Sequence, residues 1–204
     1  KNSFLMTDFG YTPGYKKTSF KKKAGEKSHF FSKYEKSFIT KNDAENNLKI
    51  NIQEVSNDKY LKLYKIKSNL VDNNINSTEK SLEFSSEKEN SFFGLNAAVY
   101  ETLKESYNDK YEYILPEITF DKNLEIYDNF GYLDYQVNIK AQNYDTNKTS
   151  KFFTNDFNWE SKDINTKFGF NNKFLGNLKN INYENKNIDL YKNDFTSEIY
   201  GSTG

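Results

Sequence analysis

The feature that most constrains this chain is a strict alternation of apolar and polar residues at residues 131–142. Because successive side chains of a β-strand point to opposite faces, a period of two held for about ten residues predicts a half-buried strand. Its apolar row holds Leu133, Tyr135, Val137, Ile139 and Ala141, and its polar row holds Asp134, Gln136, Asn138, Lys140 and Gln142.

The same alternation recurs along the chain, whereas helical periodicity is weak. Apolar rows fall at Leu48, Ile50 and Ile52, at Phe93, Leu95, Ala97 and Val99, at Phe153, Phe157 and Trp159, and within residues 111–120. Noisier patterns predict further strands at residues 3–11, 30–38, 61–70 and 167–178. Nine or more strands in about 200 residues indicate an all-β fold.

Breaks rich in Asn, Asp and Lys separate these strands in two alternating sets. One set lies near residues 72–77, 105–109, 144–148 and 182–193, and the other near 87–90, 122–129 and 161–165. Each set repeats about every 36 residues, which is one hairpin of two long strands with its connections. We therefore expect an antiparallel meander of long strands that forms part of a transmembrane β-barrel. The periodicity alone suits a large soluble sheet or a surface adhesin equally well.

Composition favours the barrel. The mean hydropathy of −0.94 and the hydrophobic fraction of 35% resemble a disordered chain, but the aromatic fraction of 17% does not. In a wide barrel only the lipid-facing half of each strand must be apolar, and rings gather in girdles at the membrane interfaces. Many Tyr and Phe residues lie near the expected strand ends, although strands also favour aromatic residues in general.

Several classes of function are disfavoured by residues that the chain lacks. It has no Cys and a single histidine, His29, so we expect no catalytic residue, no metal site and no cofactor. Its 29 cations are all Lys and balance 29 acidic residues, which argues against nucleic acid as a partner. No apolar window is long enough for a transmembrane helix. We expect no enzymatic activity.

Four strings of residues resemble one known family. They are EVSNDKYL at residues 54–61, NDKYEYILP at 108–116, FGYLD at 130–134 and NYDTN at 143–147. In order and spacing they are similar to the middle of the C-terminal barrel domain of the LPS-assembly outer-membrane protein (LptD, or OstA) family. Two further strings, DFGYTPGY at residues 8–15 and SHFFSKY at 28–34, look similar to earlier barrel strands of its alphaproteobacterial members. The positions that carry the resemblance are Asp58, Tyr60, Tyr111, Pro116, Gly131, Leu133, Tyr144 and Thr146.

The resemblance implies a function, a location and partners. Members of this family insert lipopolysaccharide into the outer leaflet of the outer membrane of Gram-negative bacteria. The implied partners are lipopolysaccharide, outer-membrane lipid, a plug lipoprotein of the LptE type, and periplasmic Lpt bridge proteins that act through an N-terminal jelly roll. We expect residues 1–204 to be an internal barrel fragment without that jelly roll or the terminal strands. The lack of Cys casts doubt on the disulfides that the family often carries.

The polar row Asp134, Gln136, Asn138, Lys140 and Gln142 is the main candidate site. In a barrel it would face the lumen and form part of a hydrophilic path for sugars; in a soluble protein it would be a wetted sheet face. Pro116 removes one ladder donor, so we expect it at a bulge. The breaks near residues 105, 145 and 185 are expected to lie outside the cell. Another outer-membrane barrel, such as a porin or receptor, and a soluble or surface carbohydrate-binding β protein remain as alternatives.

Overall fold

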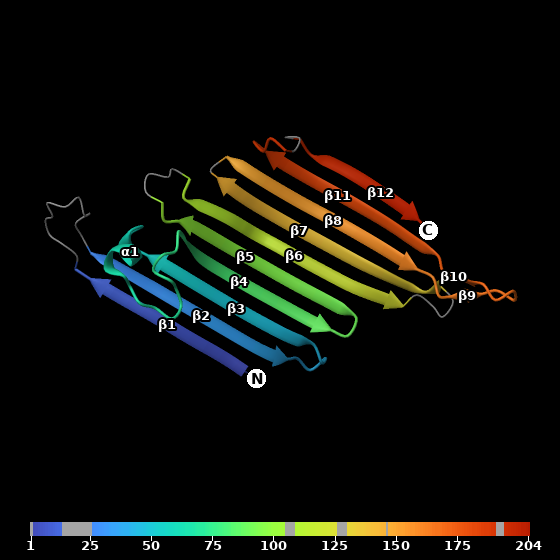
Figure 1. The fold of residues 1–204 in the computed structure, drawn as a ribbon, viewed down its shortest axis with the longest axis horizontal. Helices are drawn as coiled ribbons and strands as arrows, with labels where there is room; N and C mark the ends of the chain where they lie inside the picture. Colours follow the sequence, from blue (N-terminus) through green and yellow to red (C-terminus); the bar gives the residue numbers. More distant parts are fainter. Residues whose placement is uncertain (1, 14–25, 105–108, 126–129, 146, 191–193) are drawn as a thin grey trace.

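The computed structural model describes residues 2–13, 26–104, 109–125, 130–145, 147–190 and 194–204. They form a ten-stranded antiparallel sheet in the order β1-β2-β3-β4-β5-β6-β7-β8-β11-β12, and a small β9–β10 hairpin (Figure 1). The strands are β1 Asn2–Thr12, β2 Lys27–Ile39, β3 Glu45–Val55, β4 Ser77–Lys88, β5 Ser91–Thr102, β6 Tyr111–Glu125, β7 Tyr132–Asp145, β8 Lys148–Glu160, β9 Ile164–Asn165, β10 Asn171–Asn172, β11 Leu175–Lys186 and β12 Thr196–Thr203. One short helix, α1 Tyr60–Tyr64, lies between β3 and β4.

The all-β antiparallel meander predicted from the alternation is confirmed. Each strand of the large sheet pairs with its neighbours in the chain, except that β8 pairs with β11 across the β9–β10 hairpin. The ten strands contain between 8 and 15 residues. Within the described residues, β1 and β12 are each paired on one side only, so the sheet has two open edges.

The strand predicted at residues 61–70 is wrong. Residues 60–64 form the helix α1, which ends where Lys65 adopts a left-handed conformation with φ 49°. The apolar and polar residues of this stretch do alternate, but β3 is already paired with β2 on one side and β4 on the other. No ladder position is left for another strand here, and the apolar side chains pack onto the sheet instead.

Two further boundaries differ from the prediction. Residues 167–178 are not one strand, because a turn with Gly169 at φ 82° precedes β10, and β11 begins only at Leu175. The break predicted from residue 182 begins five residues later, at residue 187, because β11 stays paired with β8 through Lys186. Polar residues such as Asn182 and Asn185 therefore lie inside a strand and not in a loop.

Pro116 lies where the sequence predicts. The pairing of β6 with β5 shifts between Asn96 and Ala98, and its pairing with β7 shifts between Ile114 and Glu117. Proline has no backbone N–H to donate to a neighbouring strand. Because Pro116 lies where the pairing is already irregular, the regular ladders before and after it lose no hydrogen bond.

The sheet separates apolar from polar side chains. Directly opposed residues of neighbouring strands point to the same face, so the register assigns every strand residue to one of two faces. A continuous apolar row runs through six strands along Leu48, Phe84, Leu95, Ile118, Ile139 and Phe153. The matching row behind it runs along Lys49, Glu83, Asn96, Glu117 and Lys140 before it reaches Phe152. We call these the apolar face and the polar face.

In the part of the chain that the structure describes, no other layer covers the apolar face. Within the described residues, the only elements in extensive contact are hydrogen-bonded neighbours within the sheets. Large apolar side chains stay solvent-exposed: Leu5 64%, Phe9 69%, Leu82 38%, Leu178 48% and Ile199 70%. The face is interrupted at β8 and β11 by Asn155 and Asn180, whose side-chain amides hydrogen-bond to each other at 3.4 Å. Its ion pairs Lys80–Glu54 and Lys151–Glu184 lie toward the end of the sheet where β3 meets its connection to β4.

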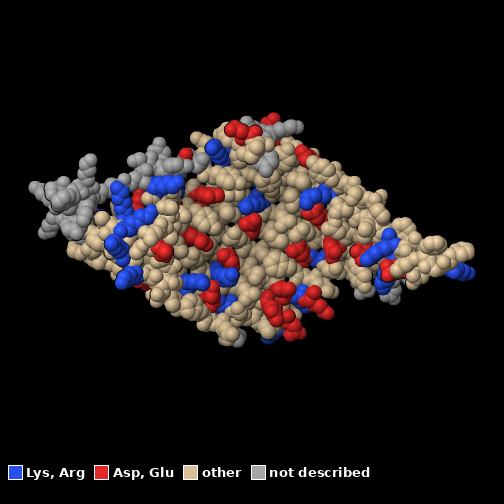
Figure 2. Space-filling view, viewed as in Figure 1, with Lys and Arg blue, Asp and Glu red and all other residues tan. Residues whose placement is uncertain are grey.

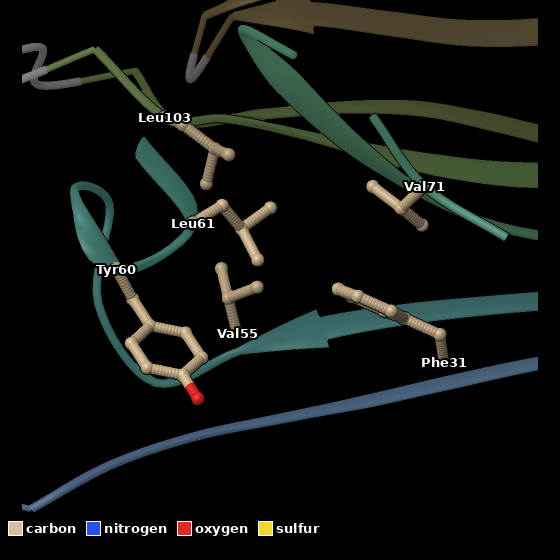
Figure 3. Packing of buried hydrophobic residues seen from close by; sticks show 6 residues of the cluster. All are labelled: Phe31, Val55, Tyr60, Leu61, Val71 and Leu103. Atoms are coloured by element: carbon tan, nitrogen blue, oxygen red, sulfur yellow. The ribbon is translucent and has the colours of Figure 1, made fainter. Parts of the chain in front are cut away.

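The buried apolar core lies on the polar face. Residues 56–76, which we call the β3–β4 segment, fold back over β2 and β3. Figure 3 shows side chains converging from β2, from the end of β3, from this segment and from the residue after β5. The cluster consists of Phe31, Val55, Tyr60, Leu61, Val71 and Leu103.

The aromatic residues near strand ends are divided between the two faces. Phe93, Tyr113 and Phe153 lie on the apolar face, whereas Phe92, Tyr100 and Phe152 lie on the polar face. Tyr107 and Tyr127 are outside the described residues. Only part of the aromatic set can therefore contribute to an interfacial girdle on the apolar face.

Candidate functional site

The five residues of the predicted polar row lie together on one strand. Asp134, Gln136, Asn138, Lys140 and Gln142 all point to the polar face of β7. Each lies opposite a polar or charged residue on both neighbouring strands, except that Lys140 faces Phe152 on β8 and Gln142 faces Ile114 on β6. The structure places the row; whether it forms a sugar path remains a prediction.

The side chains of this row are held by their neighbours. The Thr119 hydroxyl donates to the Asn138 side-chain oxygen at 3.1 Å, and the Gln142 amide donates to the Glu112 carboxylate at 2.6 Å. Lys140 lies 3.5 Å from Glu117. Figure 2 shows acidic and basic side chains mixed over the face that it presents. A surface with many amides, hydroxyls and paired charges of both signs offers hydrogen bonds without a strong field of either sign.

A hollow of about 840 Å³ lies at the end of the sheet where β5 and β7 end and β6 and β8 begin. Its walls combine the rings of Tyr100, Tyr144 and Phe152 with the cations Lys104, Lys110 and Lys148. Ligand pockets commonly join an apolar lining of this kind with a few convergent polar groups.

Two polar side chains at this hollow are buried without partners. Ser150 lines the hollow and is 2% exposed, and its cross-strand partner Asn185 is 0% exposed. Neither the Ser150 hydroxyl nor the two polar atoms of the Asn185 amide has a hydrogen bond in the structure. A buried polar group left unpaired costs about 1–3 kcal/mol, so a water molecule or a ligand that bonds to this pair would be stabilising. Both residues were missed from the sequence alone, because only the strand register shows that Ser150 and Asn185 lie opposite each other and are buried.

The β3–β4 segment is fastened to β1 and β2 through His29. The His29 ring is 5% exposed, lies 3.3 Å from the Tyr60 hydroxyl and 3.4 Å from Asp8, and stacks on Phe31 at 4.6 Å. Burial raises the pKa of the Tyr60 hydroxyl above its ordinary value, and Tyr64 and Asp8 add to that shift. The single histidine is thus a packing and hydrogen-bonding centre for this segment.

A second fastening joins the segment to the connection between β5 and β6. Lys110 Nζ donates to both oxygens of Asp58 at 2.9 Å. This hydrogen bond is the main reason that the pKa of Lys110 is raised above its ordinary value of 10.5, and desolvation opposes the shift. Asp58 and Lys110 belong to two of the strings that resemble the LPS-assembly family, at residues 54–61 and 108–116. The structure therefore brings these distant motifs together.

The remaining motif residues have structural positions. Tyr60 is buried at the start of α1, and the exposed Tyr111 donates its hydroxyl to Glu101 at 3.2 Å. Gly131 has φ 89°, and a Cβ there would lie 1.9 Å from the Glu160 carbonyl oxygen, so no other residue fits. Leu133 lies on the apolar face of β7, and Tyr144 lines the hollow. Thr146 lies outside the described residues.

Nothing in the described part of the chain assembles a metal centre or a membrane-spanning helix. No group of three or more His, Asp or Glu side chains there is placed to hold a metal ion. None of the helices in that part is both long and apolar enough to cross a membrane.

Comparison with known proteins gave no relative. No protein-family model matches this chain, and no curated protein matches it. Any functional assignment therefore depends on the two faces of the sheet and on the motifs quoted above.

Proposed function

We propose that this chain forms part of the wall of an outer-membrane β-barrel, and that its polar face lines the passage by which lipopolysaccharide reaches the outer leaflet. The observation that carries the proposal is the separation of faces. The ten strands of the large sheet place an apolar surface on one side, which nothing in the described residues covers, and a polar surface on the other.

The apolar face supports a membrane location. Apolar patches on soluble monomers rarely exceed a few hundred Å², yet this one extends across most of the sheet. Lipid is the solvent in which such a surface is stable. A membrane-spanning strand needs about 9–11 residues, and the strands here contain 8 to 15.

The open edges support a barrel that further strands would close. A long edge strand exposes unpaired backbone groups, and within a bilayer such groups are not tolerated. The edges at β1 and β12 therefore require partner strands. In barrels of this type, one set of turns is short and faces the periplasm, and longer loops face outward. The connections of 21 residues between β3 and β4, eight between β5 and β6 and nine between β11 and β12 lie at one end, and the 14-residue connection that carries the β9–β10 hairpin lies at the other.

The polar face and the motifs support the choice of substrate. Amide and hydroxyl groups both donate and accept hydrogen bonds, as sugar hydroxyls do, and lysines near the hollow match phosphate or carboxylate substituents. The four strings similar to the LPS-assembly family lie on β3 to β7 and their connections. A partner lipoprotein and periplasmic bridge proteins belong to this proposal through that resemblance alone.

Cell fractionation tests the membrane location. The full-length protein should sediment with outer membranes and resist extraction at alkaline pH. Recovery in the aqueous phase after detergent extraction would overturn the proposal in favour of a soluble carbohydrate-binding protein.

Site-specific photo-crosslinking tests the substrate. A photoreactive residue at Gln136, on the polar face, should crosslink lipopolysaccharide only while transport proceeds. The matched probe at Val137 would face the lipid, so it should crosslink surrounding lipid whether or not transport continues. Failure of Gln136 to crosslink in an inserted protein would exclude the transport path and favour a porin or a receptor.

A further inference from the structure

The β3–β4 segment is much longer than its connection requires. Residues 56–76 join two strands that are antiparallel neighbours, a task that two to five residues usually accomplish. The extra chain does not extend away from the sheet. It returns over the polar face, where Ile66 to Asn73 and the β1 residues Met6 and Asp8 line one hollow.

Its packing is that of a fixed element. Tyr60 and Leu61 are each 2% exposed and Val71 is 7% exposed, and all three pack against side chains of the strands beneath them. Phe31, at the centre of this contact, is fully buried. A segment that hides several large apolar side chains opens far less often than a surface loop does.

Hydrogen bonds hold the segment at both sides. On the β1–β2 side, Tyr60 contacts His29, and the Ser68 hydroxyl bonds to Asp8. On the β5–β6 side, Asp58 receives both bonds from Lys110. The segment therefore bridges from the first strand to the connection that follows the fifth strand.

We propose that residues 56–76 are a permanent constriction built into the passage, and that transported material crosses the polar face over β5 to β11 instead. This inference rests on the proposed barrel. The β1–β3 part of the polar face is occupied by the segment, and the hollow with the unpaired Ser150 and Asn185 lies on the other part. The constriction keeps the passage narrow without a second protein at this position.

Thiol labelling of the full-length protein tests the packing, and it does so whether or not a barrel forms. Since these 204 residues contain no Cys, a substituted Cys adds the one thiol of this region. Leu61→Cys should react with a membrane-impermeant maleimide at least about 100-fold more slowly than Leu63→Cys, whose native side chain is 38% exposed on the same helix. Val71→Cys should be protected similarly, which guards against local damage at Leu61. Equal rates at the buried and exposed positions would overturn the inference.

Conductance of the inserted protein tests the constriction. Replacement of residues 57–75 by a short Gly-Ser linker should raise single-channel conductance several-fold and admit larger neutral solutes. The variant Leu63→Ser, on the exposed side of α1, should leave both unchanged. Unchanged conductance in the shortened protein would overturn the constriction even if labelling is slow. If the wild-type protein never inserts, both the proposed function and the passage are overturned. Slow labelling would then still establish the packing of the β3–β4 segment.

Discussion

Replacing Ile139 by lysine distinguishes a membrane-spanning sheet from a soluble one. Ile139 lies near the middle of β7 on the apolar face, directly between Ile118 and Phe153. Its chain neighbour Asn138 points the other way, between Thr119 and Thr154. The variants Ile139→Lys and Asn138→Lys therefore add the same charge at the same depth on opposite faces.

The two environments predict very different costs. A lysine facing lipid near the midplane of a barrel costs about 2–4 kcal/mol, which lowers the folding equilibrium constant by roughly 30- to 1,000-fold. The lysine of Asn138→Lys would lie beside Glu117 and Lys140 on a wetted face, where substitutions change stability by about 0.5 kcal/mol or less. If the apolar face met water instead, both positions would be only partly buried, and both changes would be mild.

The assay is reversible urea unfolding of the full-length protein in phospholipid vesicles, with both variants measured beside the wild type. We expect Ile139→Lys to be less stable than Asn138→Lys by at least about 1.5 kcal/mol. This is the lowest expected cost of a lysine facing lipid, about 2 kcal/mol, minus the cost of about 0.5 kcal/mol on the polar face. Equal stabilities of the two variants would refute the assignment of the apolar face to lipid.

Two further predictions concern the turns and the fastening of the β3–β4 segment. Gly131→Ala should be destabilising by about 3 kcal/mol or more because its Cβ meets the Glu160 carbonyl, whereas Gly169→Ala, also at positive φ but with open space, should cost about 1–2 kcal/mol; equal losses in thermal unfolding would contradict the steric argument. The hydrogen bond to Asp58 raises the pKa of Lys110, so its stabilisation is complete below the unfolded value of 10.5 and is lost as pH rises through the folded value. The thermal midpoint of Asp58→Asn should therefore lie below that of the wild type at pH 9 and converge with it at more alkaline pH; a constant gap would exclude the pair as the cause.

Most strands of the large sheet were predictable because each one carries its own evidence, but β4 and β12, at residues 77–88 and 196–203, were missed. The period of two in β7 fixes which residues share a face, and pairing with neighbours leaves that assignment unchanged. The meander followed because two alternating sets of breaks, each repeating about every 36 residues, predict hairpins of two long strands. The polar row from Asp134 to Gln142 was predictable for the same reason, as it is the other half of the same alternation.

The β3–β4 segment was not predictable from local pattern. Residues 61–70 alternate like a strand, but whether they become one depends on a free ladder position, which is a property of the whole sheet. The partners of Tyr60 and Asp58 lie 31 and 52 residues away in sequence, at His29 and Lys110. The buried pair of Ser150 and Asn185 likewise depends on the register of β8 with β11.

The position of the buried core explains how so polar a chain adopts a defined fold. In a soluble sheet the apolar face would be covered by a second layer, and the core would lie between them. Here the apolar rows are left bare, and the cluster around Phe31 and Leu61 lies on the opposite, polar side. These two facts are compatible if the two faces of the sheet are in contact with different solvents. In the proposed barrel, lipid would take the place of a second layer on the apolar face, and only a segment within the aqueous passage would need a core of its own.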